Sequence, residues 1–385
     1  MRKIIKPSLI YIIFILFIIQ IFIFSCELFD PKSPQESPDK PLMAKAVAAG
    51  YYHSLVLDQE NSLWACGDND YYQLGTGNNK DLNLFTRVLT NIKSIGIGTR
   101  FSFAIKNDGT LWAAGKNDYG QLGLGNIPYV TTFTKVNGIE NVKLVVSKYY
   151  HTLVLTEDGK LYASGYNSDG QLGTNDLVNR SYFVLVLSDV KQIAVGAYHS
   201  LALKNDGSLW VAGKNDFGQL GTNDNDDRWV FTFVLSDVKQ IAAGIDHSVI
   251  LKNDGTLWTT GYNGYAQLGL GDITDRKSFT QVTSIENIDQ IFAGYNSTFV
   301  LKNDGTLWAV GSNANKQFGI GTNYDNTIRD FIQIFSDVLF ISSAYFQTLI
   351  IKNNGTVWAA GYNYYGELGL GNNDIISIFT QVFVY

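Results

Sequence analysis

Short apolar runs, each bounded by glycine, asparagine or aspartate, recur along the chain from residue 44 onward. One unit reads "AGIDHSVILKNDGTLWTTGYNGYAQLGLGD" over residues 243–272. Its runs at 247–251 and 256–261 predict two short strands joined by a tight turn at "NDG". Asparagine, aspartate and glycine tolerate the positive φ angles that such a turn requires. Weaker runs at 278–282 and 289–294 predict two more strands. Because no helical period occurs after residue 43, we expect an all-β fold built from antiparallel strands.

The phrase "KNDGTLW" at 106–112 and its near copies mark seven such units. Their aligned aromatic residues are Trp64, Trp112, Tyr162, Trp210, Trp258, Trp308 and Trp358. Neighbouring members of this series are 48 or 50 residues apart. Four strands in each of seven units of about 49 residues predict a closed seven-bladed β-propeller with four-stranded antiparallel blades. We interpret the Leu-Trp pair of the phrase as packing within and between blades, rather than as a sugar-stacking platform.

The two ends of the repeat region predict how the ring closes. Most units end in an element such as "VKQIAVG" (190–196), whereas the seventh stops at "FTQVFVY". The missing element stands before the first unit as "AKAVAAG" (44–50). We therefore expect the N-terminal strand to complete the last blade, which would remove the open edges of the ring.

The N-terminal segment predicts export. Residues 1–25 combine a basic start with an apolar run over 9–24, and "IFSC" places Cys26 where a bacterial lipoprotein carries its lipid. The alternative is that residues 9–24 remain as an uncleaved anchor. The prolines of 26–43 predict an extended spacer before the propeller at 44–385. We expect a protein anchored to the bacterial cell envelope, on its periplasmic or cell-surface side, in which Cys66 is the single other cysteine.

Composition narrows the classes of partner. The 45% hydrophobic content predicts a folded chain. The formal charge is −6, and without residues 1–25 it is −9, because 26 Lys and Arg then face 35 Asp and Glu. Nucleic-acid binding relies on clustered basic residues, so we expect no nucleic-acid partner and membrane contact only through the N-terminal anchor.

The unit "GAYHSLALKNDGSLWVAGKNDFGQLG" (196–221) resembles the repeat of the regulator of chromosome condensation family, and the likeness extends over residues 44–385. The resemblance implies a seven-bladed propeller. The family's namesake is a nuclear exchange factor for a small GTPase that also binds chromatin, partners which an exported acidic chain would not meet. Other bacterial relatives are secreted, and one resembles an inhibitor that binds beta-lactamases through one rim. That precedent favours a protein partner here.

The four histidines, His53, His151, His199 and His247, share one repeat position. Ligands spread over a wide ring do not converge on one ion, so we expect each histidine to hydrogen-bond within its own blade. The serines that follow three of them point to the other face of the strand, which argues against a hydrolase triad. Acidic loops such as "GTNDNDDRW" (221–229) lack calcium-loop spacing and predict solvated turns. We expect neither a metal nor a cofactor.

Tyrosines gather in the "G-x-x-H" turn and the "G-x-N-x-x-G" loop, which strand order places on one rim. Sixteen of the 22 tyrosines fall there. With two phenylalanines they form what we call the tyrosine rim: Tyr51, Tyr52, Tyr71, Tyr72, Tyr119, Tyr149, Tyr150, Tyr166, Tyr198, Phe217, Tyr262, Tyr265, Tyr295, Tyr345, Phe346, Tyr362, Tyr364 and Tyr365. The aromatic before "GQLG" resembles a family packing residue, whereas the two residues before the histidine and the middle residue of "G-x-N", which hold ten of the tyrosines, are freer. Tyrosine gives a large contact area at low entropic cost, so the pattern predicts a binding surface.

The first functional hypothesis is therefore a monomeric, non-enzymatic scaffold that binds a protein, or a glycan, through this rim. Two alternatives remain. One is exchange-factor activity of the kind found in the family. The other is a propeller enzyme, a hydrolase or lyase, with its site at the channel mouth; it requires non-repeating polar residues facing one opening, and the repeats give no sign of them.

Overall fold

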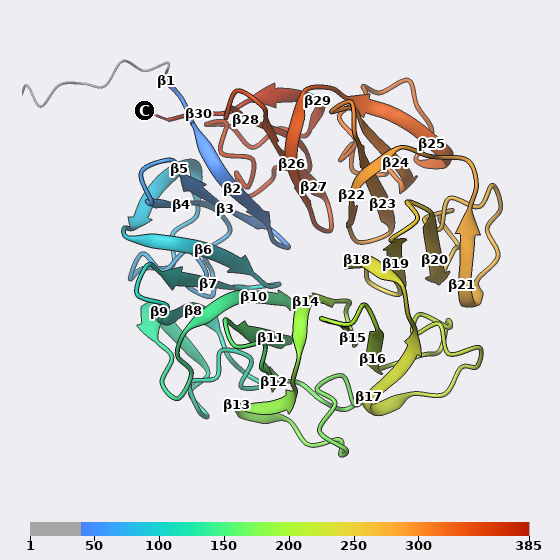
Figure 1. Ribbon diagram of the computed structural model, residues 1–385. Coiled ribbons are helices and arrows are strands. Elements are labelled where there is room, and N and C mark those ends of the chain that lie inside the picture. Colours follow the sequence, from blue (N-terminus) through green and yellow to red (C-terminus); the bar gives the residue numbers. More distant parts are fainter. Residues whose placement is uncertain (1–39, 385) are drawn as a thin grey trace, which may run out of the picture. The chain divides into compact units, whose positions relative to one another are not determined.

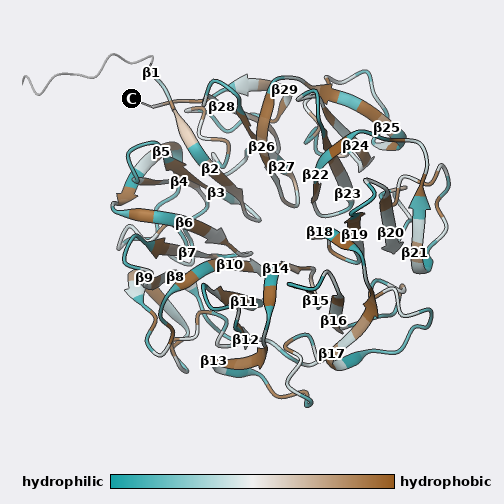
Figure 2. Ribbon diagram, in the orientation of Figure 1, coloured by the Kyte–Doolittle hydropathy of each residue, from teal (hydrophilic) through white to brown (hydrophobic). Residues whose placement is uncertain are grey.

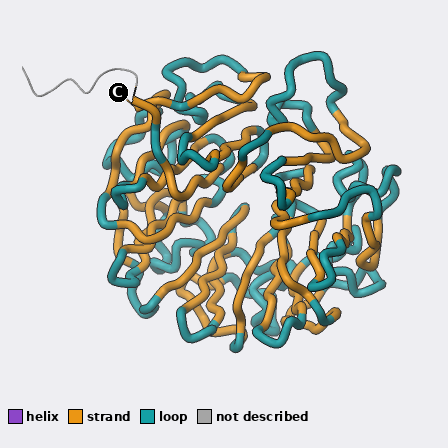
Figure 3. The backbone as a smooth tube through the Cα atoms, turned by 45° about the horizontal axis from the view of Figure 1, so that its top comes forward, coloured by secondary structure: helices purple, strands orange, loops and turns teal. Residues whose placement is uncertain are grey.

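The computed structural model describes residues 40–384, and all regular structure in that range is β-strand. Figure 3 accordingly shows only strands and loops. The strands form seven four-stranded antiparallel sheets, arranged as the seven blades of a propeller (Figure 1), and one additional two-stranded pair. Within 40–384 no helix has the length and apolar character needed to span a bilayer. The predicted fold class is thus confirmed.

Each blade consists of four strands that are consecutive in the sequence. The innermost strands are β2 (Ala44–Ala49), β6 (Ile92–Ile97), β10 (Val142–Lys148), β14 (Val190–Val195), β18 (Val238–Ala243), β22 (Ile288–Ala293) and β26 (Val338–Ser343). The second strands are β3 (His53–Asp58), β7 (Phe101–Lys106), β11 (His151–Thr156), β15 (His199–Lys204), β19 (His247–Lys252), β23 (Ser297–Lys302) and β27 (Gln347–Lys352). The third strands are β4 (Leu63–Gly67), β8 (Leu111–Lys116), β12 (Leu161–Gly165), β16 (Leu209–Gly213), β20 (Leu257–Gly261), β24 (Leu307–Ser312) and β28 (Val357–Gly361). The outermost strands are β5 (Leu82–Leu89), β9 (Tyr129–Lys135), β13 (Arg180–Leu187), β17 (Arg228–Leu235), β21 (Arg276–Val282), β25 (Thr327–Phe335) and β29 (Ile376–Gln381).

The repeated phrase forms the hairpin between the second and third strands. In blade 5, Gly255 adopts a φ of 85° and its amide donates to the carbonyl of Lys252 at 3.0 Å. The carboxylate of Asp254 accepts the amide of Thr256 at 2.9 Å, which fixes the turn. The Thr256 hydroxyl in turn accepts the indole N–H of Trp258 at 2.8 Å. The aspartate, glycine, threonine and tryptophan of the phrase therefore stabilise this hairpin.

The hydrophobic core lies between neighbouring blades as well as within them. One cluster joins Leu57 and Leu63 of blade 1 to Ile92 and Ala104 of blade 2, all of them buried. Equivalent clusters recur around the ring. In Figure 2 brown, hydrophobic positions run along the strands, while teal prevails in many connecting loops. The six tryptophans of the repeated phrase are half-buried and pack against these clusters, which agrees with a scaffold role.

The predicted mode of closure is wrong. The N-terminal strand β2 pairs with β3 in the first blade, and the last blade is complete without it as β26-β27-β28-β29. The physical reason is that each repeat carries its own innermost strand in front of the histidine strand, so that repeat and blade coincide. The seventh unit lacks nothing, because the strand that seemed missing belongs to the next blade along the chain.

The ring closes through the residues just before β2. Strand β1 (Lys40–Pro41) pairs with β30 (Phe383–Val384), and the two lie side by side in Figure 1. The amide of Leu42 donates to Val382 at 3.2 Å, and the Leu42 carbonyl accepts the amide of Val357. The buried side chains of Leu42 and Val47 join a cluster with Leu349 of blade 7. Both ends of the repeat region thus meet at one seam.

Candidate functional site

The two loops that carry the tyrosines are held together in each blade by main-chain hydrogen bonds. The amide of Tyr166 donates to the carbonyl of Tyr150 at 2.9 Å, and the amide of Tyr362 donates to Phe346 at the same distance. In the second loop the side chain of Asn167 accepts the amide of Leu172 at 2.9 Å, which fixes its shape from within. The loops are therefore a rigid support for the aromatic residues.

Four tyrosines from four different blades meet at the centre of the ring, and we call them the tyrosine plug: Tyr51, Tyr149, Tyr295 and Tyr345. The ring of Tyr345 lies 4.1 Å from that of Tyr51, 4.0 Å from Tyr295 and 5.6 Å from Tyr149, measured between centroids. Blades 3 and 7 are not neighbours, so the last contact crosses the ring. Only 6% of Tyr345 is exposed. These residues fill the end of the channel instead of projecting outward.

A second group lies farther from the centre, at the seam between blades 7 and 1. It consists of Tyr52, Phe346, Tyr362, Tyr364 and Tyr365. Tyr52 stacks on Phe346 at 5.7 Å and lies 4.7 Å from Tyr365, and Tyr362 lies 4.6 Å from Tyr364. Tyr364 is 59% exposed. We call this continuous aromatic surface the seam patch.

The remaining rim residues form smaller groups. Tyr119 contacts both Tyr150 and Tyr166 at 4.9 and 5.2 Å, and Phe217 contacts Tyr262 at 5.0 Å. Tyr71 and Tyr72 interact elsewhere: the guanidinium of Arg100 lies 4.4 Å above the Tyr71 ring, and Tyr72 stacks on Tyr129 of β9 at 5.1 Å. Apart from Tyr364, the one rim residue classed as exposed is Tyr265, at 40%.

Burial raises the pKa of several rim phenols further above physiological pH. Desolvation, together with the neighbouring phenols of Tyr149 and Tyr150, raises the pKa of Tyr198 to about 12. Desolvation also raises the pKa of Tyr52, Tyr295 and Tyr345. The rim therefore offers aromatic area and neutral hydroxyls.

The histidines are buried and link adjacent blades, which corrects the expectation of a bond within each blade. His151 Nε2 lies 3.1 Å from the hydroxyl of Ser200 in the next blade, and His199 Nε2 lies 3.0 Å from Ser248. The Ser200 hydroxyl donates to the carbonyl of Gln171 at 2.7 Å, so the imidazole donates to the serine. A serine that donates elsewhere is not activated by this histidine, and burial keeps a substrate away. The contact is structural.

These imidazoles make the protein sensitive to acid. Burial lowers the pKa of His53, His151 and His247 to about 3, and that of His199 well below its usual value. In the unfolded chain each histidine takes up a proton below about pH 6.5. The unfolded state then binds more protons than the folded one. Each histidine's contribution to stability is complete above pH 6.5 and is lost as the pH falls toward 3.

The substitution His199→Gln is expected to reduce this acid sensitivity. Glutamine occupies the same position in blade 7, where the Gln347 amide donates to Gly50 of the next blade at 3.1 Å. We expect a similar unfolding free energy at pH 7. Between about pH 6 and 4, the wild-type protein should lose about 1.4 kcal/mol per pH unit more than the variant. Urea denaturation across this range measures the difference, and parallel pH profiles would contradict the assignment.

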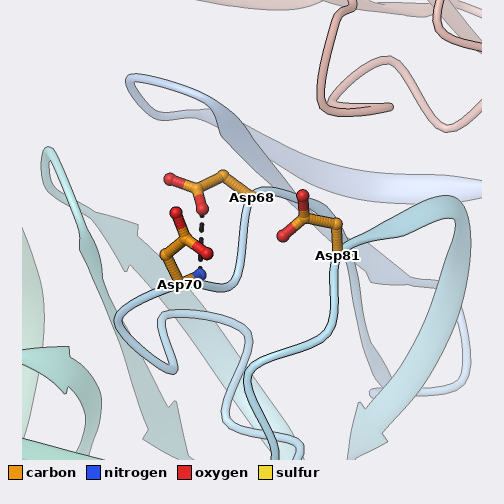
Figure 4. Close-up of side chains that lie close together, drawn as sticks. All are labelled: Asp68, Asp70 and Asp81. Atoms are coloured by element: carbon orange, nitrogen blue, oxygen red, sulfur yellow. Dashed lines mark hydrogen bonds between the residues drawn. The ribbon is translucent and has the colours of Figure 1, made fainter.

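Three carboxylates approach one another beside the rim, as Figure 4 shows for Asp68, Asp70 and Asp81. One oxygen of each lies within 4.8 Å of the others. Asp68 accepts the amide of Asp70 at 2.9 Å, and Asp81 accepts the amide of Asn69 at 2.8 Å. Burial raises the pKa of Asp68 and Asp81. In blades that lack this cluster, the amide of the equivalent loop asparagine also donates to a side-chain oxygen twelve residues further on. These contacts by themselves therefore indicate that the carboxylates stabilise the loop.

The repeats did hold one asymmetry that the sequence reasoning missed. Lys148 ends the innermost strand of blade 3, at a position where five other blades have glycine and one has alanine. It lines a cavity of about 270 Å³ bounded by the innermost strands and by Tyr51 and Tyr345 of the plug. A column-by-column alignment of the seven units would have revealed it. Cys26 and residues 9–24 lie outside the described residues.

Two profiles of the regulator of chromosome condensation (RCC1) repeat match the chain. One matches residues 44–73, 92–121, 142–171, 190–219, 238–267 and 288–317. The other matches residues 60–105, 108–155, 158–203, 206–251 and 254–301. No curated protein sequence matches significantly.

Many solved structures resemble the propeller. Human WBSCR16 is 21% identical with a TM-score of 0.75, covering 84% of this chain and 94% of its own. Yeast RCC1 (Prp20), in its complex with Kap60, is 19% identical with a TM-score of 0.76, covering 91% and 90%. Prp20p from Saccharomyces cerevisiae is 20% identical with a TM-score of 0.72, covering 89% and 86%. At these identities the likeness establishes the fold.

Proposed function

Since this chain belongs to the regulator of chromosome condensation repeat family, we propose that it is a non-enzymatic scaffold that binds a protein partner through its tyrosine rim. The observation that carries the proposal is the seam patch. Tyr52, Phe346, Tyr362, Tyr364 and Tyr365 form contacting rings on loops held by main-chain hydrogen bonds. Rigid, neutral aromatic side chains at a partly exposed surface are typical anchors of protein interfaces.

The solved relatives support a protein as the partner class. Yeast RCC1 (Prp20) has been crystallised bound to Kap60, and Prp20p from Saccharomyces cerevisiae has been studied for its binding to Gsp1p and histones. A glycan would use the same stacking surfaces, and it is the alternative outcome of the experiment below. The location we propose is the bacterial cell envelope, with lipid on Cys26 or an anchor at residues 9–24, because the N-terminal sequence has the layout of an export signal.

Exchange-factor activity is the second candidate, favoured by the family match alone. It requires a small GTPase in the compartment where the protein resides. The acidic composition after residue 25 argues against nucleic acid as a partner. Incubating the protein with a small GTPase from its own cell, preloaded with a fluorescent guanine nucleotide, tests this candidate. Accelerated nucleotide release would establish it.

Replacing Tyr362 and Tyr364 by alanine is expected to weaken capture of the partner strongly. Both rings belong to the seam patch and neither is in the plug, so the fold should be retained. The full chain and this variant serve as baits for the native envelope fraction, and recovered proteins are identified by mass spectrometry. A partner recovered by the wild-type chain should fall at least tenfold with the variant, which corresponds to about 1.4 kcal/mol or more.

The matched control is Tyr182→Ala with Tyr324→Ala. These tyrosines are 64% and 50% exposed and lie outside the tyrosine rim. The control should capture the partner as the wild-type chain does. Equal capture by all three baits would remove the rim from consideration, and loss with the control alone would move the interface to the surroundings of β13 or of the loop before β25. Recovery that is sensitive to glycosidase treatment would identify a glycan.

A further inference from the structure

Lys148 differs from the residues at the equivalent position of the other repeats, and it requires a different turn between the first two strands of blade 3. The equivalent residues in the other blades are Gly50, Gly98, Gly196, Gly244, Gly294 and Ala344. At Gly196 and Gly244 a Cβ atom would overlap the imidazole ring three residues further on. A side chain at this position is therefore excluded by the usual turn before a histidine.

Blade 3 accommodates the lysine by changing its backbone. Strand β10 is one residue longer than the other innermost strands, so that Lys148 pairs with His151. The following residue, Tyr149, takes a φ of 52°. A left-handed conformation is unfavourable for a tyrosine. Backbone strain of this kind is concentrated at functional sites, which makes the lysine a candidate.

The lysine faces the channel cavity. Its ammonium donates one hydrogen bond across the ring, to the carbonyl of Ala243 in blade 5, at 2.8 Å. Among the described residues that line the cavity it alone carries a charge. Most of the wall is apolar and includes Val146 and Phe340, whereas Ser342 and Ser343 contribute hydroxyl groups. A single ammonium group thus lines a mainly apolar cavity of about 270 Å³.

Two hydroxyl groups that line the cavity have spare hydrogen-bonding capacity. Thr99 Oγ1 makes no hydrogen bond within the described part of the protein, and the phenol of Tyr345 has only the neighbouring phenol of Tyr149 beside it. Both residues line the cavity, and Tyr345 is 6% exposed. A buried polar group without a partner is unfavourable, so these hydroxyls are free to bind a polar group brought in by a ligand.

We propose that this cavity binds a small amphipathic monocarboxylate, with its carboxylate on the Lys148 ammonium and its apolar part against the innermost strands. One positive charge matches one negative charge. The Thr99 and Tyr345 hydroxyls supply donors to a carboxylate oxygen. Inorganic phosphate has no apolar part and would leave most of the wall uncovered. The site goes beyond the proposed scaffold function and uses a different ligand, so either can fail without the other.

The charge on the lysine depends on pH. Burial lowers the pKa of Lys148 to about 8. The titratable groups around it are His151, His199 and His247, which stay neutral, and the phenols of the plug. A bound carboxylate favours the protonated lysine, so binding should weaken as the pH rises above 8.

The test measures binding of 4-phenylbutyrate to the purified full chain by isothermal titration calorimetry at pH 7. We expect saturable binding. The uncharged 4-phenylbutyramide and inorganic phosphate should each bind at least tenfold more weakly. Raising the pH to about 9.5 should weaken carboxylate binding about tenfold and leave the amide unaffected. Absence of binding at millimolar carboxylate, or equal binding of the amide or of phosphate, would overturn the proposal.

Variants locate the site. Lys148→Gln should weaken 4-phenylbutyrate binding at least tenfold, and Tyr345→Phe about threefold. Lys143→Gln makes the same change on the same strand at an exposed residue, and it should bind as the wild-type chain does. If Lys148→Gln fails to fold, the pH dependence and the amide comparison in the wild-type chain still decide. Wild-type affinity in a folded Lys148→Gln would place the carboxylate elsewhere and refute the assignment.

Discussion

A chain that begins at Gly50 instead of Lys40 is expected to lose at least about 5 kcal/mol of unfolding free energy. The missing residues include β2, the innermost strand of blade 1, and the seam residue Leu42. Leu42 and Val47 are buried against blade 7, and fully burying each such side chain contributes about 1.5–3 kcal/mol. The backbone ladder between β2 and β3 is lost as well, which leaves β3 as an open edge.

Urea denaturation followed by far-ultraviolet circular dichroism measures this loss. The chain that begins at Lys40 is the reference, because it retains both β1 and β2. We also expect the shortened chain to self-associate, since an unpaired strand edge invites pairing with a second copy. An unchanged urea midpoint would mean that the seam contributes nothing to stability, contrary to the buried cluster found there.

Gly261→Ala is expected to cost at least about 3 kcal/mol, the second large effect. Gly261 ends β20 with a φ of 104°. A Cβ atom there would overlap the carbonyl oxygen of Asp246 and lie 2.8 Å from the Cα of His247. Both obstacles are backbone atoms in the turn that supports the tyrosine rim, so they cannot rotate away. The variant adds steric overlap to an unfavourable backbone conformation.

Gly255→Ala in the same blade is the matched control. Gly255 also has a positive φ, 85°, but a Cβ atom there would meet nothing within 4 Å. It should therefore cost only about 1 kcal/mol, from the backbone conformation alone. Thermal and urea unfolding of the two variants separate the effects. Equal losses at both positions would show that close packing at the end of the third strand is unimportant.

The sequence predicted the propeller and its seven blades well, because the repeated hairpin and its tryptophan are local features with a fixed period. The closure of the ring was predicted wrongly because the sequence does not show at which strand each blade begins. A repeat has no marked beginning, so the position of "AKAVAAG" (44–50) was compatible with either end of the ring. Only the pairing of β2 with β3 decides between them.

The candidate site was predicted in part. The gathering of tyrosines in the two loops of each blade followed from the repeat pattern, and their role in binding stays a prediction. Contacts between blades could not be predicted from the sequence, because they depend on the angle between neighbouring sheets whose residues are about 49 positions apart. The histidine bond to the next blade and the meeting of Tyr149 with Tyr345 are both of this kind. Lys148 was not predicted because it departs from the shared pattern of the repeats at a single position.

The bond between blades bears on how such a ring can arise. The group that reaches forward, His199, and the group that receives from the blade behind, Ser200, are neighbours on one strand. Repeats 4 and 5, with His199–Ser200 and His247–Ser248, therefore carry both halves of this contact, whereas repeats 2, 6 and 7 have no histidine at the position. A copy of such a unit, placed beside others of the same kind, would arrive able to join the unit before it and the unit after it. Duplication and exchange of whole repeats would then preserve the ring, while the loops on its rim are free to diverge.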